Sequence, residues 1–233
     1  MNELRLIPVE GMPEIRAGDR LAELIAAHAT LDDGDVLVVT QKAVSKAEGR
    51  LVACDDADPA ARQAVVESES VRILRRRPGG LVISETRHGF VCANAGVDFS
   101  NVPSGQAALL PVDADRSARR IRDGLLALTG VRVGVIVSDT FGRPWRRGLT
   151  DVAIGCAGVA ALLDLRGQAD ANGRELHATE VAVADELAGA AELVMGKASG
   201  VPVVIVRGVD PAWLRPSSVR AELVRGPQQD FFR

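Results

Sequence analysis

The chain has 233 residues, enough for one large domain or two small interlocked ones. Its 28 basic and 31 acidic residues give a formal charge of −3, and only 3% of its residues are aromatic, which argues against a general nucleic-acid binder. With 47% apolar and 25% charged residues, the composition is that of a globular protein and excludes bulk disorder.

The cysteines and the N-terminal segment indicate the cellular compartment in which the protein is expected. Cys54, Cys92 and Cys156 are odd in number and far apart, so neither a disulfide framework nor a structural zinc site is expected. The N-terminus carries Glu3 and Arg5 without an apolar stretch, which excludes a signal peptide. No run of about 18 apolar residues is present to span a membrane. We therefore expect a cytoplasmic protein with no membrane partner.

Apolar runs alternate with helical patterns along the first half of the chain. Leucine and isoleucine recur at helical spacing after Gly18, and DVLVVT is a β-branched run typical of a strand. Pro78-Gly79-Gly80 is a helix stop signal. The predicted elements are strand 4–9, helix 18–29, strand 35–40, helix 57–77 and a strand pair at 80–84 and 89–94.

The second half repeats this alternation. The predicted elements are helix 114–129 ending at Gly130, strand 131–137, helix 179–195 and strand 201–206, followed by an irregular C-terminal segment. The run VRVGVIV is typical of a strand buried on both faces. Gly155 and Gly158 would allow close packing in the Ala-rich stretch 151–165. The fold class is α+β, and we expect one domain over residues 1–233, with room for two interlocked subdomains.

Common catalytic motifs are missing from the sequence. It contains no P-loop, no GxGxxG fingerprint, no GxSxG and no HExxH, and its three histidines are isolated. Instead, three polar segments each follow an apolar strand. In the first, residues 40–50, the side chains of Lys42, Ser45, Lys46 and Arg50 and the free amides of a helix start suit a phosphate group. A solvated helix start explains this segment equally well.

The other two segments carry carboxylates. In residues 94–101, Asp98 could bind a divalent cation and Asn101 a base or phosphate, although an ordinary Asx turn gives the same pattern. In residues 137–148, Asp139 and Thr140 supply oxygen ligands directly after a strand, beside a group of arginines. A metal with guanidinium groups is a common device for phosphoryl chemistry, and a solvated basic loop is the alternative.

Together the segments indicate an enzyme that uses a nucleoside triphosphate without a P-loop. Mg²⁺ suits a site with one or two carboxylates plus phosphate oxygens, and Asp98 with Asp139 would provide it. A metal-dependent phosphohydrolase would use the same carboxylates with water as acceptor, and a non-catalytic nucleotide-binding module would show no turnover. Residue spacing alone does not name a substrate.

At these segments the sequence resembles the coenzyme F420 γ-glutamyl ligase family (F420-0:L-glutamate ligases). The match runs over nearly the whole chain. It is carried by IPVEG (7–11), GDVLVVTQKAVSKAEGR (34–50), NAGVDFSN (94–101), VIVSDTFGRPWRRG (135–148), ATEVAVADELA (178–188) and MGKASGVPVVIVRG (195–208).

The resemblance implies a GTP-dependent ligase that needs Mn or Mg, often helped by K. Such enzymes add L-glutamate to the lactyl carboxylate of the deazaflavin coenzyme precursor through an acyl phosphate, and further γ-linked glutamates can follow. The implied fold is α+β, with mixed sheets, packed helices and an intertwined homodimer. Its partners are then three small molecules: the precursor, L-glutamate and GTP.

By position, the resemblance also assigns site residues. It implies that Asp98, Asp139 and Thr140 are metal ligands. It implies nucleotide contacts at Met12, Pro13, Glu14, Ile15, Gln41, Lys46, Asn101, Met195, Gly196, Lys197, Ala198, Ser199, Gly200, Val201 and Pro202. We further hypothesise that Arg143, Arg146 and Arg147 hold phosphate groups as catalytic residues.

Two positions depart from the family pattern. Gln41 stands where members often carry Ser, although an amide can still donate and accept hydrogen bonds. Lys197 stands where archaeal members carry an acidic residue that can serve a second metal, and an ammonium group cannot ligate a cation.

Overall fold

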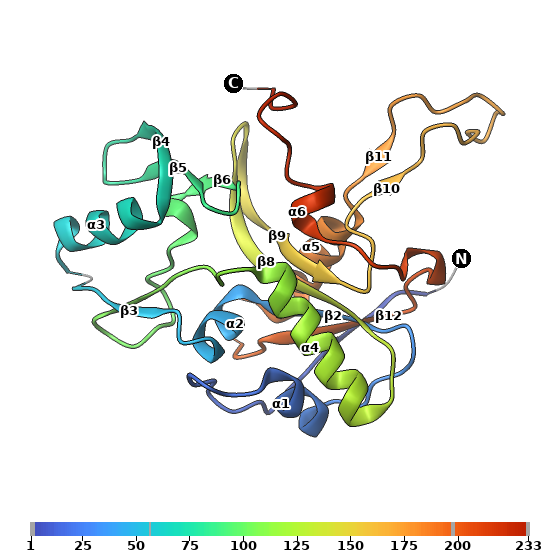
Figure 1. The fold of residues 1–233 in the computed structure, drawn as a ribbon, viewed down its shortest axis with the longest axis horizontal. Coiled ribbons are helices and arrows are strands. Elements are labelled where there is room, and N and C mark those ends of the chain that lie inside the picture. The colour runs from blue at the N-terminus through green and yellow to red at the C-terminus, as the bar shows by residue number, and fades with distance from the viewer. Residues whose placement is uncertain (1–2, 56, 197–198, 232–233) are drawn as a thin grey trace.

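The computed structural model describes residues 3–55, 57–196 and 199–231 (Figure 1). A five-stranded sheet forms its centre, built from β1 (Arg5–Pro8), β2 (Val36–Thr40), β8 (Gly134–Arg143), β9 (Arg146–Ala157) and β12 (Val203–Arg207). The strand order is β1-β12-β2-β8-β9, and within it β2 and β8 pair in parallel. The sheet is therefore mixed.

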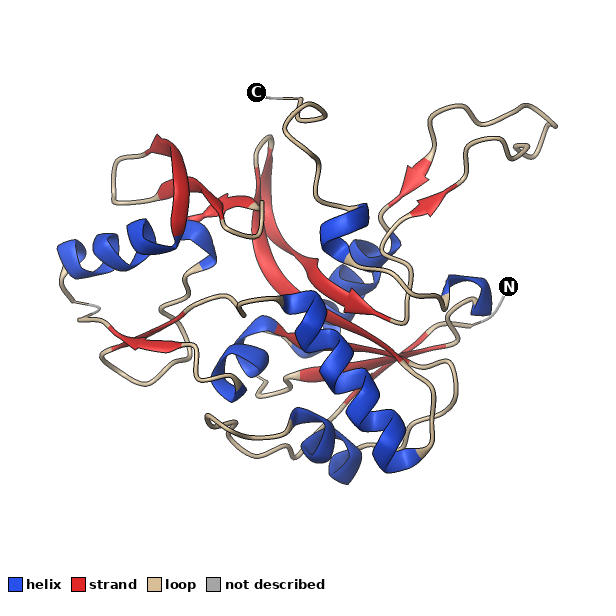
Figure 2. Cartoon of the chain, in the orientation of Figure 1, coloured by secondary structure: helices blue, strands red, loops and turns tan. Residues whose placement is uncertain are grey.

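Helices cover both faces of this sheet (Figure 2). One face packs against α1 (Leu21–His28), α2 (Gln41–Ala47) and α4 (Ala114–Thr129), and the other against α5 (Val183–Met195) and α6 (Val219–Glu222). Successive side chains of a strand point to opposite faces. Accordingly Leu37 and Val39 join the first core, whereas Val36 and Val38 join the second. The predicted burial of the central strand on both faces is confirmed, because Val135, Ile136 and Val137 are all fully buried.

Local sequence signals set the limits of α4. The Asp113 carboxylate accepts a hydrogen bond from the Arg116 amide at 2.9 Å and caps the N-terminus. Gly130 adopts φ 73°, the left-handed conformation that ends many helices. The predicted helix 114–129 is confirmed at both ends. Gly155 lets β9 approach this helix, since a Cβ there would lie 2.2 Å from the carbonyl carbon of Ala114.

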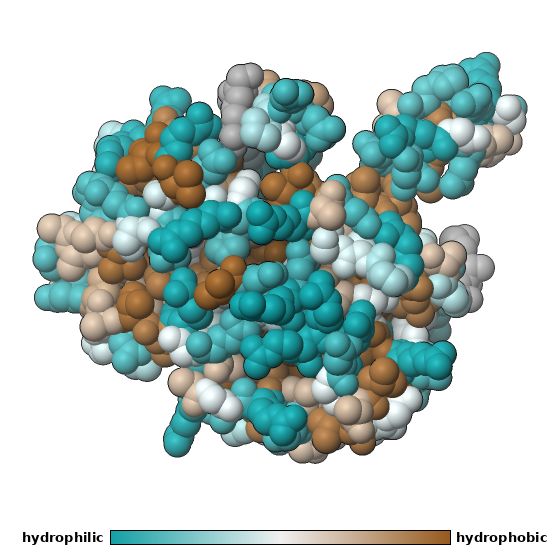
Figure 3. Space-filling view, viewed as in Figure 1, coloured by the Kyte–Doolittle hydropathy of each residue, from teal (hydrophilic) through white to brown (hydrophobic). Residues whose placement is uncertain are grey.

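A smaller lobe extends from the sheet beside β8 (Figure 1). Its elements are β3 (Leu51–Ala53), α3 (Pro59–Glu69), β4 (Ser70–Arg76), β5 (Val82–Thr86), β6 (Val91–Ala93), a 3₁₀ turn (Asn94–Gly96) and β7 (Gln106–Ala108). The lobe has an apolar cluster of its own around Cys54, Val66 and Leu109. Figure 3 shows apolar side chains over the lobe and hydrophilic ones over α4.

The structure corrects one element of this lobe. The predicted helix 57–77 ends at Glu69, and residues 70–76 form strand β4. Val71 and Ile73 are β-branched and favour a strand, and β5 offers an antiparallel partner. The Ser70 hydroxyl also donates to Ser84 Oγ at 2.9 Å, at the point where the helix gives way to the strand. Tertiary pairing therefore overrides the helical pattern.

The remaining elements lie at the far end of the molecule. Strands β10 (Leu163–Asp164) and β11 (Glu180–Val181) form the base of a protruding arm, and a 3₁₀ turn (Pro211–Trp213) precedes α6 (Figure 1). The predicted helix 179–195 begins later, at Val183, because Glu180 and Val181 pair with β10. In the described part of the chain, no helix is both long and apolar enough to cross a membrane.

Candidate active site

Strand β8 carries the predicted metal ligands beyond the core. The sequence indicates a strand end at Val137 and a loop after it, but β8 continues to Arg143 and pairs with β9 throughout. Asp139 and Thr140 therefore lie on a strand, which fixes their backbone more firmly than a loop would. This outer part of β8 rises from the sheet toward β6 (Figure 1).

The second predicted ligand, Asp98, is positioned by an unusual turn. Asn94 and Ala95 adopt positive φ values of 50° and 52°, a conformation that non-glycine residues rarely adopt. At Gly96 a Cβ would lie 2.8 Å from the Leu110 side chain, so glycine is required there. Asp98 then exchanges two backbone hydrogen bonds with Ala108, of 2.9 and 2.8 Å. Such strain is typical of functional segments.

Lys42, at the start of α2, holds the Asp98 carboxylate. Its Nζ lies 2.8 Å from Asp98 Oδ2 and donates to the Ser100 carbonyl at 2.8 Å. The Ser100 amide and hydroxyl both donate to Asp98 Oδ1 at 2.7 Å. Burial opposes ionisation of Asp98, but the hydrogen bonds from Lys42 and Ser100 outweigh it and lower the pKa of this carboxyl. Asp98 is thus an ionised carboxylate at neutral pH.

A third carboxylate, Asp151, completes the cluster from β9. It is buried and lies opposite Thr140 in the hairpin register. The Thr140 hydroxyl donates to Asp151 Oδ1 at 2.6 Å, and the Ser138 hydroxyl donates to Oδ2 at 3.1 Å. Asp98, Asp139 and Asp151 are close enough for the charges of the other two to act on Asp139.

The surroundings of Asp139 raise its pKa to about 7. Burial is the main cause, and the charges of Asp98 and Asp151 add to it, whereas a hydrogen bond from the Thr140 backbone opposes the rise. The same field reaches the Cys92 thiol on β6, whose pKa is raised to about 12 by burial and by Asp139. This corner of the molecule has an excess of negative charge.

Such an excess fits a bound divalent cation. Lys42 pairs with Asp98 and its charge also acts on Asp139, so one ammonium group stands against three carboxylates, and the donors are hard oxygen atoms of the kind that Mg²⁺ and Mn²⁺ accept. Among the described residues, no group of three or more His, Cys, Asp or Glu side chains forms a ready-made metal centre. A cation here would take one or two carboxylates and complete its shell with water or phosphate oxygens, as Mg²⁺ does.

The predicted nucleotide-contact segments lie on either side of α2. Lys46 on this helix pairs with Glu14 at 2.5 Å, which joins it to the segment Met12–Ile15. Within that segment Ile15 is buried and Met12 packs on the core. On the other side, the Thr40 amide donates to the Pro202 carbonyl at 3.0 Å.

The second predicted nucleotide-contact segment runs from Met195 to Pro202. Met195 is buried at the end of α5, and Val201 packs against the core beneath the sheet. Gly196 and Gly200 have positive φ values of 59° and 71° and are exposed, and the Ser199 hydroxyl donates to the Met195 carbonyl. The predicted contacts at Lys197 and Ala198 lie outside the described residues.

Three side chains of the predicted phosphate segment point elsewhere. The Gln41 side chain is buried and donates to Leu109 O at 3.0 Å and to Ser45 Oγ at 2.7 Å. Ser45 in turn donates to Leu109 O at 2.6 Å, and Arg50 bonds Leu110 O and Glu69. These groups tie α2 to the smaller lobe. The Gln41 amide is thus used inside the protein, and the nucleotide contact predicted at Gln41 stays a prediction.

The arginines predicted beside the metal ligands lie at the tip of the β8–β9 hairpin. Arg143, Arg146 and Arg147 are exposed there, and Arg143 donates to the Arg147 carbonyl at 2.5 Å. At about 3.3 Å per strand residue, four residues separate Arg143 from Asp139 by roughly 13 Å. The backbone of the hairpin tip is thus well separated from that of Asp139, because the strand continues where a loop was expected. Asn101 lies in the same segment as Asp98 and has φ 51°.

Comparison with known proteins assigns the family. A family model described as F420-0:Gamma-glutamyl ligase matches residues 11–208. The chain belongs to this family. A Coenzyme F420:L-glutamate ligase from Methanopyrus kandleri is 47% identical over 247 residues, covering 99% of this chain and 98% of the relative. Relatives of the same name from Methanothermobacter thermautotrophicus and Archaeoglobus fulgidus are 44% and 43% identical, each over 99% of this chain and over 99% and 96% of their own lengths.

Sequence reasoning paired Asp98 with Asp139 but missed Asp151. The missed signal is the hairpin register, in which a turn at Pro144 and Trp145 puts Asp151 opposite Thr140. It also counted Lys42 only as a phosphate contact, whereas the structure makes it the partner of Asp98.

Proposed function

We propose that this protein is a GTP-dependent ligase that joins L-glutamate to the carboxylate of a coenzyme F420 precursor. The observation that carries the proposal is the convergence of Asp98, Asp139 and Asp151 beside Lys42. It occurs in a chain whose relatives are named Coenzyme F420:L-glutamate ligase. A reaction between anions needs such a site, because a cation held there offsets the charge of the phosphates.

Two steps account for the ligation. A carboxylate oxygen of the precursor attacks the γ-phosphorus of GTP, the bond to the bridging oxygen breaks, and GDP leaves. The glutamate amine then attacks the acyl carbon, phosphate leaves, the amine loses a proton and an amide remains. Further rounds on the γ-carboxylate of the added residue would lengthen the product by the same chemistry.

The chain's own residues have separable roles in this scheme. Asp98, Asp139 and Thr140 would hold Mn²⁺ or Mg²⁺, with K⁺ as a further cation, and a bound metal would polarise the phosphoryl oxygens. Lys42 keeps Asp98 ionised and oriented. Lys46, Glu14 and the segment ending at Pro202 would flank the nucleotide on either side of α2.

A mass measurement tests the proposal. The precursor, GTP, L-glutamate and Mn²⁺ are incubated with and without the protein, and the product is weighed by mass spectrometry. Growth by one or more glutamyl units that requires GTP supports the ligase and counts the additions. Phosphate release without glutamate and without a mass change supports the metal-dependent phosphohydrolase instead.

We also propose that the ligase acts as a homodimer in the cytoplasm. On β9, Ala153 donates to Asp185 of α5 at 2.8 Å, and Gly189 lies against Thr150, so α5 runs antiparallel to β9. Leu193, one helical turn further, therefore lies toward Leu149. These side chains and Trp145 are 79%, 67% and 81% exposed, and an apolar patch of this kind is typical of an interface.

Light scattering after size-exclusion chromatography tests the homodimer. The wild-type chain should elute with twice the chain mass of 24.6 kDa, and Leu193→Asp should shift it toward the monomer. Arg75→Ala, on the other lobe, serves as the control. A wild-type monomer at micromolar concentration would contradict the homodimer while leaving the ligase chemistry intact.

A further inference from the structure

Two cavities lie along α3, each lined by different residues, and Asp98 of the carboxylate cluster lines the smaller one. The first has a volume of about 630 Å³ and the second about 420 Å³, both within the usual range for small-molecule sites of about 300–1,000 Å³. Each is bounded by α3 on one side and by part of the segment 94–105 on the other. Of the predicted nucleotide contacts only Asn101 belongs to this segment, and it is not among the residues that line either cavity.

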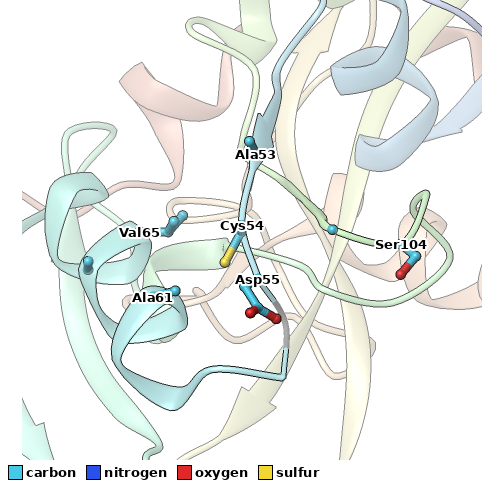
Figure 4. A pocket seen from close by; sticks show the side chains of 8 residues that line it. Ala53, Cys54, Asp55, Ala61, Val65 and Ser104 are labelled. Carbon is cyan, nitrogen blue, oxygen red and sulfur yellow. The ribbon is translucent and has the colours of Figure 1, made fainter.

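The larger cavity is lined by small side chains. Figure 4 shows Ala61 and Val65 of α3 on one side of Cys54 and Ser104 on the other. Ala53, Ala64 and Gly105 also line it, and Asp55 supplies its charged group. Short, mostly apolar side chains leave flat walls, and such walls suit a planar ring better than a branched or strongly charged group.

The smaller cavity is lined both by a cationic side chain and by a residue of the carboxylate cluster. Arg62 of α3 and Asp98 of the cluster both line it. The Arg62 guanidinium lies over the Phe99 ring, 4.4 Å from its centre, a contact that orients the side chain without neutralising its charge. Among the residues the structure describes, no carboxylate forms an ion pair with Arg62. An anion entering this cavity would therefore meet an oriented guanidinium close to the carboxylate cluster.

We propose that these two cavities bind the acceptor substrate, with Arg62 as the residue that recognises its anionic group. This inference rests on the proposed ligase function, in which the acceptor joins a planar ring to a phosphodiester and a carboxylate. The larger cavity takes the ring, and Arg62 pairs with the phosphodiester. The acceptor carboxylate then points toward Asp98 and the phosphoryl group.

Charge suits an anionic acceptor at this place. Lys42 is already paired with Asp98 and the proposed metal would be taken up by the phosphates of GTP, so a further cation is needed for the anionic acceptor. Arg62 of α3 supplies it, because it lines the same cavity as Asp98. A guanidinium can bind two phosphate oxygens at once, which an ammonium group cannot do in fixed geometry.

Steady-state kinetics with each substrate varied in turn tests the role of Arg62. Because a charged hydrogen-bonded pair is lost, Arg62→Ala should raise KM for the acceptor at least about tenfold. KM for GTP should change less than about twofold. Arg62→Lys should fall between Arg62→Ala and the wild type. Arg75→Ala, an exposed arginine on β4 outside both cavities, should match the wild type.

Three results would overturn the assignment. The first is an unchanged KM for the acceptor in Arg62→Ala. The second is an increase in KM for GTP alone, and the third is an equal increase in KM for both substrates. Arg62 is exposed, so these variants should fold as the wild type does. If the wild-type protein itself forms no glutamylated product, the proposed function fails, whereas a working wild type with an unaffected Arg62→Ala rejects only this inference.

A second pair of variants tests the larger cavity directly. Ala64→Leu fills part of it at an exposed helix position where leucine is well tolerated. Ala60→Leu lies on the same helix outside both cavities and is the control. Calorimetric titration of the precursor alone should show weaker binding to Ala64→Leu and unchanged binding to Ala60→Leu. Equal affinity of the precursor for both variants would show that its ring does not bind in this cavity.

Discussion

The inner and outer halves of strand β8 share one hydrogen-bonded ladder with β9 but differ in their side chains. Val135, Ile136 and Val137 are fully buried between helices on both faces of the sheet. Beyond them, Ser138–Arg143 carries hydroxyls, a carboxylate and a guanidinium. The comparison indicates that the packed half anchors the strand and thereby fixes the atoms of the polar half.

The largest effect is expected in the inner half. Ile136→Ala removes a fully buried side chain and leaves a cavity, so the free energy of unfolding should fall by about 2–5 kcal/mol. Urea denaturation measures this loss, and Leu128→Ala, at a half-exposed helix position, should cost about 0.5 kcal/mol or less. If Ile136→Ala lost turnover per folded molecule without losing stability, the division between the two halves would be wrong.

A substitution in the outer half of β8 should lower activity without lowering stability. Asp139→Asn keeps the shape of the side chain but removes a charge from the predicted metal site. We expect kcat to fall by about 100-fold or more, with a stability equal to or above that of the wild type. Glu175→Gln, an exposed carboxylate on the arm, is the matched control. Wild-type turnover by Asp139→Asn at saturating Mn²⁺ would remove Asp139 from the site.

The pH dependence of stability sharpens the same comparison. The folded, metal-free protein raises the pKa of Asp139 from its ordinary 3.8 to about 7, so it binds this proton more tightly than the unfolded chain does. This contribution to stability is full below about pH 4 and is lost as the pH rises toward 7. Unfolding curves in chelator between pH 4 and 8 should show it, and Asp139→Asn should lack this part of the slope.

Adding Mn²⁺ to the same samples gives the complementary result. A cation binds the ionised carboxylate, so the stabilisation by Mn²⁺ should increase from pH 5 to pH 8. A pH-independent metal effect in the wild type, or an equal effect in Asp139→Asn, would show that the cation binds elsewhere.

Sequence patterns predicted the inner half well because its causes are local. Three successive apolar residues between turn signals mark a buried strand, and Asp113 with Gly130 sets the limits of α4 without help from distant residues. The pairing of Asp98 with Asp139 was predicted as well, from carboxylates that follow strands. These features depend on short-range pattern and chain order.

What the sequence could not reveal depends on pairing across the fold. Residues 70–76 become a strand because β5 lies beside them. Asp151 joins the cluster only through the register of the hairpin, in which it faces Thr140. The Gln41 amide turns inward because Leu109 presents a carbonyl there. In each case the deciding contact comes from a partner that is distant in sequence or set by strand register.

The smallest effect is expected at the tip of the β8–β9 hairpin, beyond the two halves of β8 compared above. Arg146 is exposed at the hairpin tip and pairs with Arg143, whose Cα lies about 13 Å along the strand from that of Asp139. Arg146→Ala should therefore change KM for GTP and for the acceptor by less than about threefold, a change worth under about 0.7 kcal/mol. A tenfold rise in either KM would place the tip in a binding site, formed either within one chain or with a second copy. Repeating the kinetics on mixtures of Arg146→Ala and Asp139→Asn would then decide the matter. Recovery of activity above that of either variant alone would require two chains to share one site.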